Sequence, residues 1–415
     1  VRDYDFIVGG GIYPAKNFSA VEADDFIDTL GLPFEPRDYQ KDAFVYAIRN
    51  RRCVLLSPTA SGKSLIIYMI QKYYQARTLV IVPTISLVTQ MAGDFRDYGS
   101  QEDVHLITAG ESKDTDCRVT ISTWQSIHKM SKKWFDQFDV VIGDEAHQFK
   151  AKSLTSIMTK LTNCNFRFGL TGTLDGAQTN KLVLEGLFGP VKQVVKTKEL
   201  IDKKHLADFK IKMIVLKYDE AVCKQVKDYK YQEEMDFLVR NEQRNKFITN
   251  LALSLKGNSL ILYQFVEKHG EVLNALIKAK AEGRHVFFVH GGTDGDTREQ
   301  VRAITEKEDN AIIIASFGTF STGVNIRNLH NIVFASPSKS RIRNLQSIGR
   351  GLRKGDNKSA ATLIDIADDL TYKSKSNFTL KHFAERVKLY NEEKFDYKIY
   401  KVKLHESHPQ TNTLF

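Results

Sequence analysis

Short apolar runs alternate with amphipathic stretches along the first half of the chain. CVLLSPT leads into GKSLIIYMIQKYY, TLVIVPT leads into SLVTQMAGDFRDY, and the runs HLITAG, RVTISTW, FDVVIGDEAH and FRFGLTGT follow. Continuous apolar runs that end in small or polar residues are typical of buried strands in a parallel sheet. The alternation therefore predicts a doubly wound α/β domain over residues 35–204.

The same pattern returns in the second half of the chain. The apolar runs SLILYQF, HVFFVHG, AIIIASFG, NIVFAS and ATLIDIAD are separated by amphipathic stretches. They predict a second α/β domain over residues 205–372, whose charged segment 219–256 favours helix. Residues 373–415 predict an amphipathic helix followed by a strand-like tail. Residues 1–34 are interpreted as an extension at the edge of a removed domain, because the sequence begins with VRD rather than Met.

The composition narrows the class of protein only slightly. Of 415 residues, 42% are hydrophobic and 27% are charged, and no run approaches 18 consecutive apolar residues, so we expect no membrane span. The four cysteines (Cys53, Cys117, Cys164 and Cys223) form no C-x-x-C pair, which argues against a zinc or iron–sulfur site and fits a reducing cytoplasm. The net charge of +10 is compatible with a polyanionic partner, although a basic soluble protein without one shows the same balance.

A phosphate-binding loop follows the first apolar run. Residues 57–64, SPTASGKS, match the pattern G-x-x-x-x-G-K-[ST] at every position but the first, where Ser57 replaces glycine. In such a loop the backbone N–H groups at the start of the next helix hold phosphate oxygens. Lys63 would neutralise the β- and γ-phosphates of ATP, and the Ser64 hydroxyl would hold Mg²⁺. The expected nucleotide-binding positions of the loop are Thr59, Ala60, Ser61, Gly62, Lys63 and Ser64.

The assignment of a phosphate-binding loop has an alternative, and such a loop alone does not identify the class of protein. A chance Gly-Lys-Ser turn would show the same letters, but the position between an apolar strand and an amphipathic helix disfavours it.

A carboxylate pair supplies the second part of the site. The strand-like run FDVVIGDEAH delivers Asp144 and Glu145 at its carboxyl end, where ligands bind in open parallel sheets. Asp144 is expected to hold the magnesium ion, and Glu145 is expected to orient and deprotonate the attacking water.

The residues 144–147, Asp-Glu-Ala-His, resemble the D-E-A-H box of superfamily 2 helicases, and other motifs of that family appear in order. They are RDYQ (37–40), VPTISLVTQ (82–90), TAG (108–110), ISTWQSI (121–127), TGT (171–173), LYQFVEKHG (262–270), SFGTFSTGVNI (316–326) and QSIGRGLRK (346–354). The resemblance covers residues 35–372. It implies an α/β fold of two tandem RecA-like domains, doubly wound on parallel sheets, with an interdomain cleft.

The resemblance also assigns roles to residues in these motifs. Gln40 would pair with the adenine edge of ATP and Arg37 would stack on the base. Further nucleotide contacts are implied at Gly323 and Asn325, the latter standing where many relatives have Asp. The implied nucleic-acid contacts are Thr84, Gly110, Thr123, Trp124, Thr319 and Thr322, although a buried core position is an equal alternative for Trp124. Thr171 and Thr173, with His147 as their partner, would relay between the ATP and DNA sides.

The last motif carries a separate physical argument. Gln346, Arg350 and Arg353 are spaced i, i+4 and i+7, so a helix would place them on one face. Two guanidinium groups on one stripe suit bidentate contact with a phosphate, and such arginine fingers contribute roughly 10³–10⁵ in rate. A basic helix that faces nucleic acid is the alternative, since residues 339–354 hold six Lys or Arg and no acid.

Together the motifs predict an ATP hydrolase that is coupled to DNA unwinding and uses ATP and Mg²⁺. Within the superfamily, the stretches RDYQKDAF, SPTASGKSLI, GDEAHQFKA and GLTGTLDG are similar to recombination and repair helicases of bacteriophages. That similarity implies action on single-stranded and branched DNA through junction branch migration, stalled-fork processing, R-loop unwinding and strand annealing. We expect a monomer in the cytoplasm of a bacterial host.

Other functions share these motifs. A DEAH-box RNA helicase is one alternative, and a DNA-binding and annealing module with a regulatory ATPase is another. A restriction-enzyme motor subunit is disfavoured, because the sequence shows no convincing carboxylate cluster for a nuclease.

Overall fold

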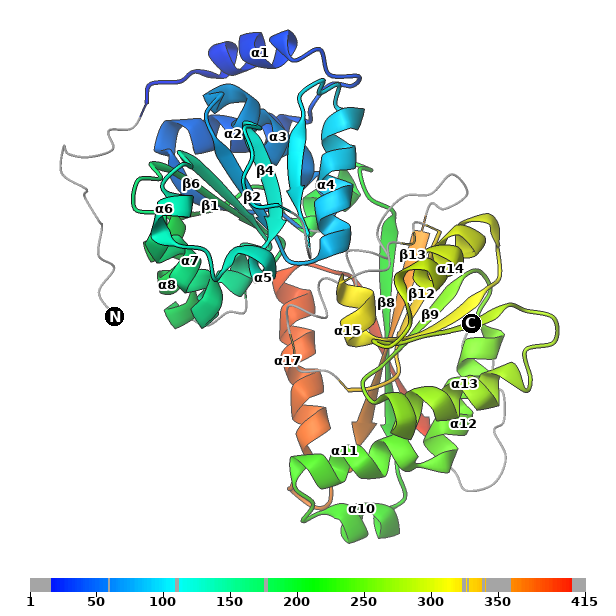
Figure 1. Cartoon of the computed structure of the whole chain (residues 1–415). Helices are drawn as coiled ribbons and strands as arrows, with labels where there is room; N and C mark the ends of the chain where they lie inside the picture. The colour runs from blue at the N-terminus through cyan, green and yellow to red at the C-terminus, as the bar shows by residue number, and fades with distance from the viewer. Residues whose placement is uncertain are drawn as a thin grey trace. The chain divides into compact units, whose positions relative to one another are not determined.

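The chain folds into two compact units, Val1–Lys196 and Thr197–Phe415. The structure is a computed structural model, and it describes residues 16–58, 60–108, 112–174, 178–322, 326, 328–337, 340 and 360–404. Each unit is a seven-stranded sheet with flanking helices, and every strand pair in the described part of the chain is parallel (Figure 1). The predicted α/β fold with two tandem doubly wound sheets is confirmed.

The sheet of the first unit has the strand order β3-β4-β2-β5-β6-β1-β7. Its strands are β1 (Arg52–Leu56), β2 (Thr78–Val82), β3 (Val104–Ile107), β4 (Val119–Thr123), β5 (Val140–Asp144), β6 (Phe166–Thr171) and β7 (Val191–Gln193). Its helices are α1 (Ala20–Thr29), α2 (Asp38–Asn50), α3 (Lys63–Tyr74), α4 (Ile85–Asp97), α5 (Trp124–Ile127), α6 (Lys132–Phe135), the 3-10 helix η1 (Ala146–Lys150), α7 (Lys152–Lys160) and α8 (Gln178–Phe188). In this order β5, β6 and β1 are neighbours, so their carboxyl ends lie next to one another.

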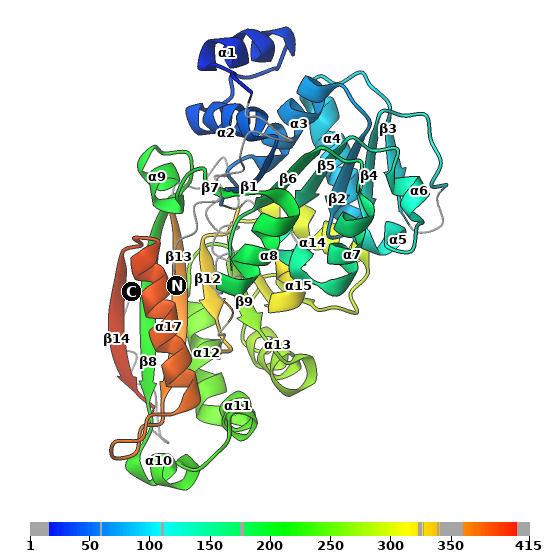
Figure 2. The same cartoon turned by 90° about the vertical axis from the view of Figure 1, so that its left-hand side faces the viewer.

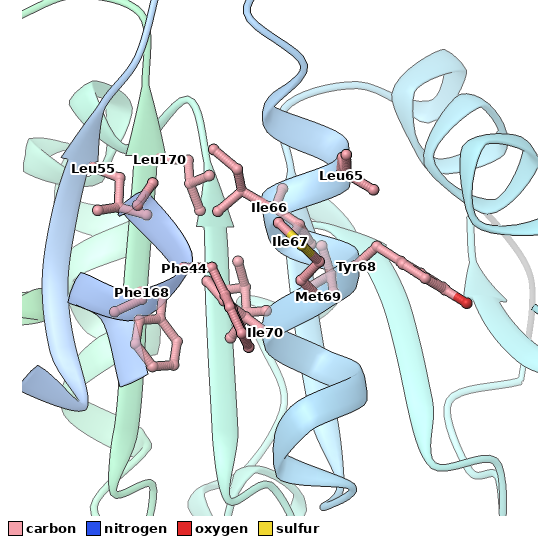
Figure 3. Packing of buried hydrophobic residues seen from close by; sticks show 14 of the residues in the cluster. Phe44, Leu55, Leu65, Ile66, Ile67, Tyr68, Met69, Ile70, Phe168 and Leu170 are labelled. Carbon is pink, nitrogen blue, oxygen red and sulfur yellow. The ribbon is translucent and has the colours of Figure 1, made fainter. Parts of the chain in front are cut away.

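Two apolar layers cover the faces of this sheet, because successive strand residues point to opposite sides. On one face the strands meet α1–α4, and Figure 3 shows Leu55, Phe168 and Leu170 directed toward Phe44 of α2 and Ile66 of α3. On the other face the intervening residues, such as Val54 and Val141, meet η1 and α5–α8. Because α3 is covered by the sheet and its neighbouring helices, every side chain from residue 65 to residue 71 is buried.

The second unit has the strand order β10-β11-β9-β12-β13-β8-β14. Its strands are β8 (Asp208–Lys217), β9 (Ser259–Tyr263), β10 (Val286–Val289), β11 (Ile312–Ser316), β12 (Asn331–Phe334), β13 (Ala360–Asp369) and β14 (Tyr397–Lys403). Its helices are α9 (Thr197–Asp202), α10 (Glu220–Val226), α11 (Tyr231–Arg240), α12 (Glu242–Ser254), the π-helix η2 (Val266–Gly270), α13 (Glu271–Lys278), α14 (Gly295–Lys307), α15 (Phe317–Thr322) and α17 (Phe378–Glu392).

The segment predicted as a helix and strand tail is part of the second unit. β14 pairs with β8 along its whole length, and α17 lies over this edge of the sheet (Figure 2). Two buried ion pairs attach helices to β13. Arg386 of α17 binds both carboxylate oxygens of Asp365 at 2.8 Å, and Arg244 of α12 binds those of Asp368 at 2.8 and 3.0 Å.

Candidate active site

The phosphate-binding loop joins the end of β1 to the start of α3. Gly62 caps α3 with φ = +78°, and Ala60 also lies in the left-handed region at φ = +66°. A Cβ at position 62 would stand 2.4 Å from Nε2 of Gln40, so glycine is required there for its backbone angle and for space. Thr59 lies outside the described residues. The backbone therefore turns sharply just before Lys63 and Ser64, which begin α3, as the sequence pattern predicts.

Ser57, which replaces the first glycine of the pattern, has a structural role. Its backbone N–H donates to the carbonyl of Thr171 at 2.9 Å, which ties the loop to the neighbouring strand β6. The hydroxyls of Ser57 and Ser61 are 2.7 Å apart, and Ser61 donates to the carbonyl of Pro58 at 2.6 Å. Since a hydroxyl has one proton, Ser57 is the donor to Ser61. The buried Ser57 side chain thus links the two ends of the turn through its hydrogen bond to Ser61.

Gln40 and Tyr39, at the start of α2, hold the loop from the other side. The Gln40 side chain accepts from the backbone N–H of Arg37 at 2.9 Å and donates to the carbonyls of Ser61 and Gly62 at 3.0 and 3.2 Å. The Tyr39 hydroxyl accepts from the Arg37 guanidinium at 2.8 Å and donates to the Ser61 carbonyl at 2.8 Å. The structure thus places Gln40 on the loop itself. Tyr39 was not predicted from the sequence, and its only signal was its place beside Gln40.

Asp144 and Glu145 follow at the end of β5. The Glu145 backbone N–H donates to Oδ1 of Asp144 at 2.9 Å, and Glu145 has φ = +51°, a left-handed angle that is costly for this residue type. Burial, and next the negative charge of Glu145, raise the pKa of Asp144 to about 6, while Lys63 lowers it in part. The ionised form of Asp144 is therefore poorly compensated, which favours binding of a cation at this carboxylate.

A paired glycine position explains how the D-E-A-H turn fits on the sheet. Gly143 of β5 and Gly169 of β6 are register partners. A Cβ on Gly143 would stand 2.7 Å from the ring of Phe149, and one on Gly169 would stand 2.9 Å from the Cβ of Ala146. The two glycines leave a slot into which η1 packs its buried Ala146 and Phe149, and this packing seats the turn that carries Glu145.

His147 and Thr171 are brought together with Glu145. The distance from His147 Nδ1 to Thr171 Oγ1 is 2.8 Å, and His147 Nδ1 lies 3.3 Å from Oε2 of Glu145. The Thr171 hydroxyl is within hydrogen-bond distance of the Glu145 carboxylate at 3.4 Å and of the Thr173 carbonyl at 3.1 Å. Because both of these partners accept, His147 Nδ1–H is the donor to Thr171. Two of the three residues predicted to couple two functions, His147 and Thr171, thus lie close to the predicted water-activating carboxylate.

The donors available for a divalent cation fit magnesium. Ser64 offers a hydroxyl and Asp144 a carboxylate, and the described residues contain no group of three or more His, Cys, Asp or Glu that could form a protein cage. Mg²⁺ keeps several waters and is usually bound through one or two protein ligands together with substrate phosphates. The Ser64 hydroxyl lies 2.7 Å from the hydroxyl of Tyr98, a residue that no sequence motif singles out.

The predicted nucleic-acid contacts occupy different environments. Thr84 is a half-buried N-cap of α4 and accepts from Leu87 N–H at 3.4 Å, whereas Thr123 is buried and hydrogen-bonds to Ser126 at 2.9 Å. Half-buried Trp124 packs against the core beneath α5–α8. In the second unit, Thr319 is buried with its hydroxyl 2.8 Å from that of Ser316, and Thr322 ends α15. The remaining predicted residues, Gly110, Gly323, Asn325, Gln346, Arg350 and Arg353, lie outside the described residues.

In the described part of the chain, no helix has the length and apolar character needed to cross a membrane.

Comparison with known proteins gives consistent matches over both units. The family model of the type III restriction enzyme res subunit matches residues 33–176, and that of the helicase conserved C-terminal domain matches residues 242–355. The chain is 38% identical to the ATP-dependent DNA helicase UvsW of Enterobacteria phage T4, over 88% of this chain and 76% of UvsW. It is 27% identical to the DNA 3'-5' translocase XPB2 of Sulfurisphaera tokodaii, over 83% and 85% of the two chains.

A solved structure supports the fold independently. A fragment of a putative HsdR subunit of a type I restriction enzyme from Vibrio vulnificus aligns with a TM-score of 0.67 at 18% identity, over 92% of this chain and 72% of that one.

Proposed function

Because this chain belongs to the superfamily 2 DNA helicases of the D-E-A-H type, we propose that it processes branched DNA. It is an ATP-hydrolysing DNA helicase, and the proposed activities are branch migration of junctions, processing of stalled forks, R-loop unwinding and strand annealing. The observation that carries this proposal is the 38% identity to UvsW over 88% of the chain, since the motifs resemble those of phage recombination and repair helicases. We further propose that it acts as a monomer in a bacterial cytoplasm.

The loop and strand ends support specific roles in ATP hydrolysis. Lys63 would neutralise charge on the β- and γ-phosphates, and Ser64 and Asp144 would hold Mg²⁺. When bound, Mg²⁺ neutralises negative charge on the phosphate oxygens. Glu145 would take a proton from the attacking water, and its hydrogen-bond distance to Thr171 supports a fixed carboxylate orientation. Gln40 would contact the adenine edge of ATP, as its motif implies, and its side-chain amide also holds the loop by donating to the carbonyls of Ser61 and Gly62.

The roles proposed outside the first unit, and at its nucleic-acid face, rest on the motifs. Arg350 and Arg353, with Gln346, are proposed to bind the γ-phosphate. His147, Thr171 and Thr173 are proposed to couple hydrolysis to DNA. The direct contacts among Glu145, His147 and Thr171 support that proposal, because a shift of Thr171 would move the carboxylate that activates water.

Steady-state ATP hydrolysis tests the substrate. The intact chain is assayed with Mg²⁺ alone and then with single-stranded DNA, a four-way DNA junction, or RNA of matched length. We expect the largest stimulation from the junction. Stimulation by RNA alone would contradict the proposal and indicate an RNA helicase. Lys63→Ala is the control for contaminating ATPases.

Unwinding separates a motor from an annealing module. Lys63→Ala should still bind junction DNA, because no DNA contact is assigned to Lys63, but it should not migrate the junction. Equal junction migration by both proteins would show that hydrolysis does not drive the movement.

A further inference from the structure

Tyr98 joins the end of α4 to the start of α3 at a position that the helicase motifs do not cover. Its hydroxyl lies 2.7 Å from Oγ of Ser64, across 34 residues of sequence. The two residues come from different helices, so this distance depends on how α3 and α4 pack. Ser64 supplies the hydroxyl ligand proposed for the cation. Tyr98 therefore contacts the proposed ligand directly, on the ligand's own hydroxyl oxygen.

The ring of Tyr98 is held on two sides. It makes an edge-to-face contact with Phe34, with ring centres 5.8 Å apart, and a similar contact with Tyr68 at 5.4 Å. Its backbone N–H donates to the carbonyl of Asp94 at 3.0 Å, which fixes the ring to the last turn of α4. The hydroxyl therefore has little freedom to leave Ser64.

The chemistry of the pair suits a supporting contact. A serine hydroxyl has one proton and two lone pairs. When Ser64 donates its proton to the Tyr98 oxygen, both lone pairs of the Ser64 oxygen remain available for a cation. The hydrogen bond fixes the rotation of the Ser64 hydroxyl and with it the direction of these lone pairs. Groups that orient a metal ligand in this way commonly contribute 10–100-fold to metal affinity.

We propose that Tyr98 is a positioning residue, which orients the Ser64 hydroxyl toward the divalent cation of the nucleotide. The inference rests on the proposed role of Ser64 as a cation ligand. It assigns to α4 a function at the nucleotide, in addition to the nucleic-acid contact proposed at its other end, Thr84. In this proposal Tyr98 acts on the cation only through Ser64.

Nucleotide binding tests the proposal without relying on hydrolysis. The affinity of the intact chain for a fluorescent ADP is measured in EDTA and across a Mg²⁺ titration. Tyr98→Phe keeps the ring and removes only the hydroxyl. We expect the Mg²⁺ concentration at half-maximal effect to rise about tenfold, with the affinity in EDTA unchanged. Tyr68→Phe is the matched control, because it removes a hydroxyl one helical turn beyond Ser64 and should leave the titration unchanged.

Ser64→Ala separates this inference from the function on which it rests. It should lose the Mg²⁺-dependent gain in affinity. If Ser64→Ala loses that gain while Tyr98→Phe titrates like the unmodified chain, the role of Tyr98 is overturned and the cation site stands. If Ser64→Ala also titrates like the unmodified chain, the cation assignment falls and the role of Tyr98 falls with it.

Discussion

The two sheets of this protein use the carboxylates on their strands in opposite ways. In the second unit, Asp365 and Asp368 of β13 are each bound by both arms of an arginine, and the side chains of these pairs are at most 2% exposed. In the first unit, Asp144 ends β5 next to a second carboxylate, and its pKa is raised to about 6 by burial and by Glu145. In the second unit, arginines of the flanking helices neutralise these carboxylates, whereas in the first unit an external cation would compensate the charge of Asp144.

This difference shows why carboxylates on the strands of similar sheets need not have similar roles. A buried ion pair with bidentate geometry has its charges satisfied by the protein, so it contributes to structure and offers no ligand site. A carboxylate with a raised pKa has a free-energy cost when ionised, and a bound cation lowers that cost. The contrast can be tested by changing one member of each arrangement.

The largest expected effect is on the second unit. Arg244→Met should lower the free energy of unfolding by about 3–5 kcal/mol, because Asp368 would remain buried without its partner. Chemical denaturation, followed by circular dichroism of the backbone, measures the free energy of unfolding. The double variant Arg244→Met, Asp368→Leu should recover much of the loss. If the single variant is as stable as the unmodified chain, the pair is not the structural element described above.

In the first unit, the same kind of change should affect chemistry rather than folding. Lys63→Ala should lower the rate of ATP hydrolysis by about 10²–10³-fold, because an electrostatic contact to the phosphates is lost. Its thermal unfolding midpoint without nucleotide should stay close to that of the unmodified chain. A large drop in that midpoint would mean that Lys63 is structural, and the contrast between the units would be weaker.

Asp144→Asn should stabilise the first unit in the absence of nucleotide and Mg²⁺. The pKa of Asp144 is raised on folding, so the folded state binds its proton more tightly, and stability is lost as pH rises from about 4 through about 6. The variant cannot ionise, so its advantage should be near zero below pH 4 and about 3 kcal/mol above pH 6, at about 1.4 kcal/mol for each unit of the raised pKa. Unfolding at pH 4, 6 and 8 measures this, and an advantage independent of pH would contradict it.

The smallest effect is expected at the loop position that departs from the phosphate-binding pattern. Ser57→Ala removes the donor to Ser61 and should weaken ATP binding by a few fold, in line with about 1 kcal/mol for one hydrogen bond. Ser57→Gly, which restores the common residue, should behave in the same way, because it also lacks the hydroxyl. Unchanged affinity in both variants would show that the Ser57–Ser61 contact does not shape the loop.

Much of this architecture could be predicted from the sequence. The run before Ser57 became β1, and FDVVIGDEAH became β5 with Asp144 as its last residue, because long apolar runs bounded by polar residues have few other solutions. The contacts of Tyr98, Ser57 and Tyr39 could not be predicted, since each depends on the packing of elements that are distant in sequence. The pairing of β14 with β8 is of the same kind, because a strand-like tail does not specify its neighbour.

The paired glycines of β5 and β6 have a consequence for how this region tolerates change. Neither Gly143 nor Gly169 has a left-handed backbone angle, so their restriction comes from the neighbouring side chains and not from φ. In a library of variants, Gly143 should accept a larger residue only together with a smaller one at Phe149 or Phe188, and Gly169 only together with glycine at position 146. The two glycines, which carry no chemistry, would then vary in concert with these neighbours, and the D-E-A-H turn would be inherited as a packed block.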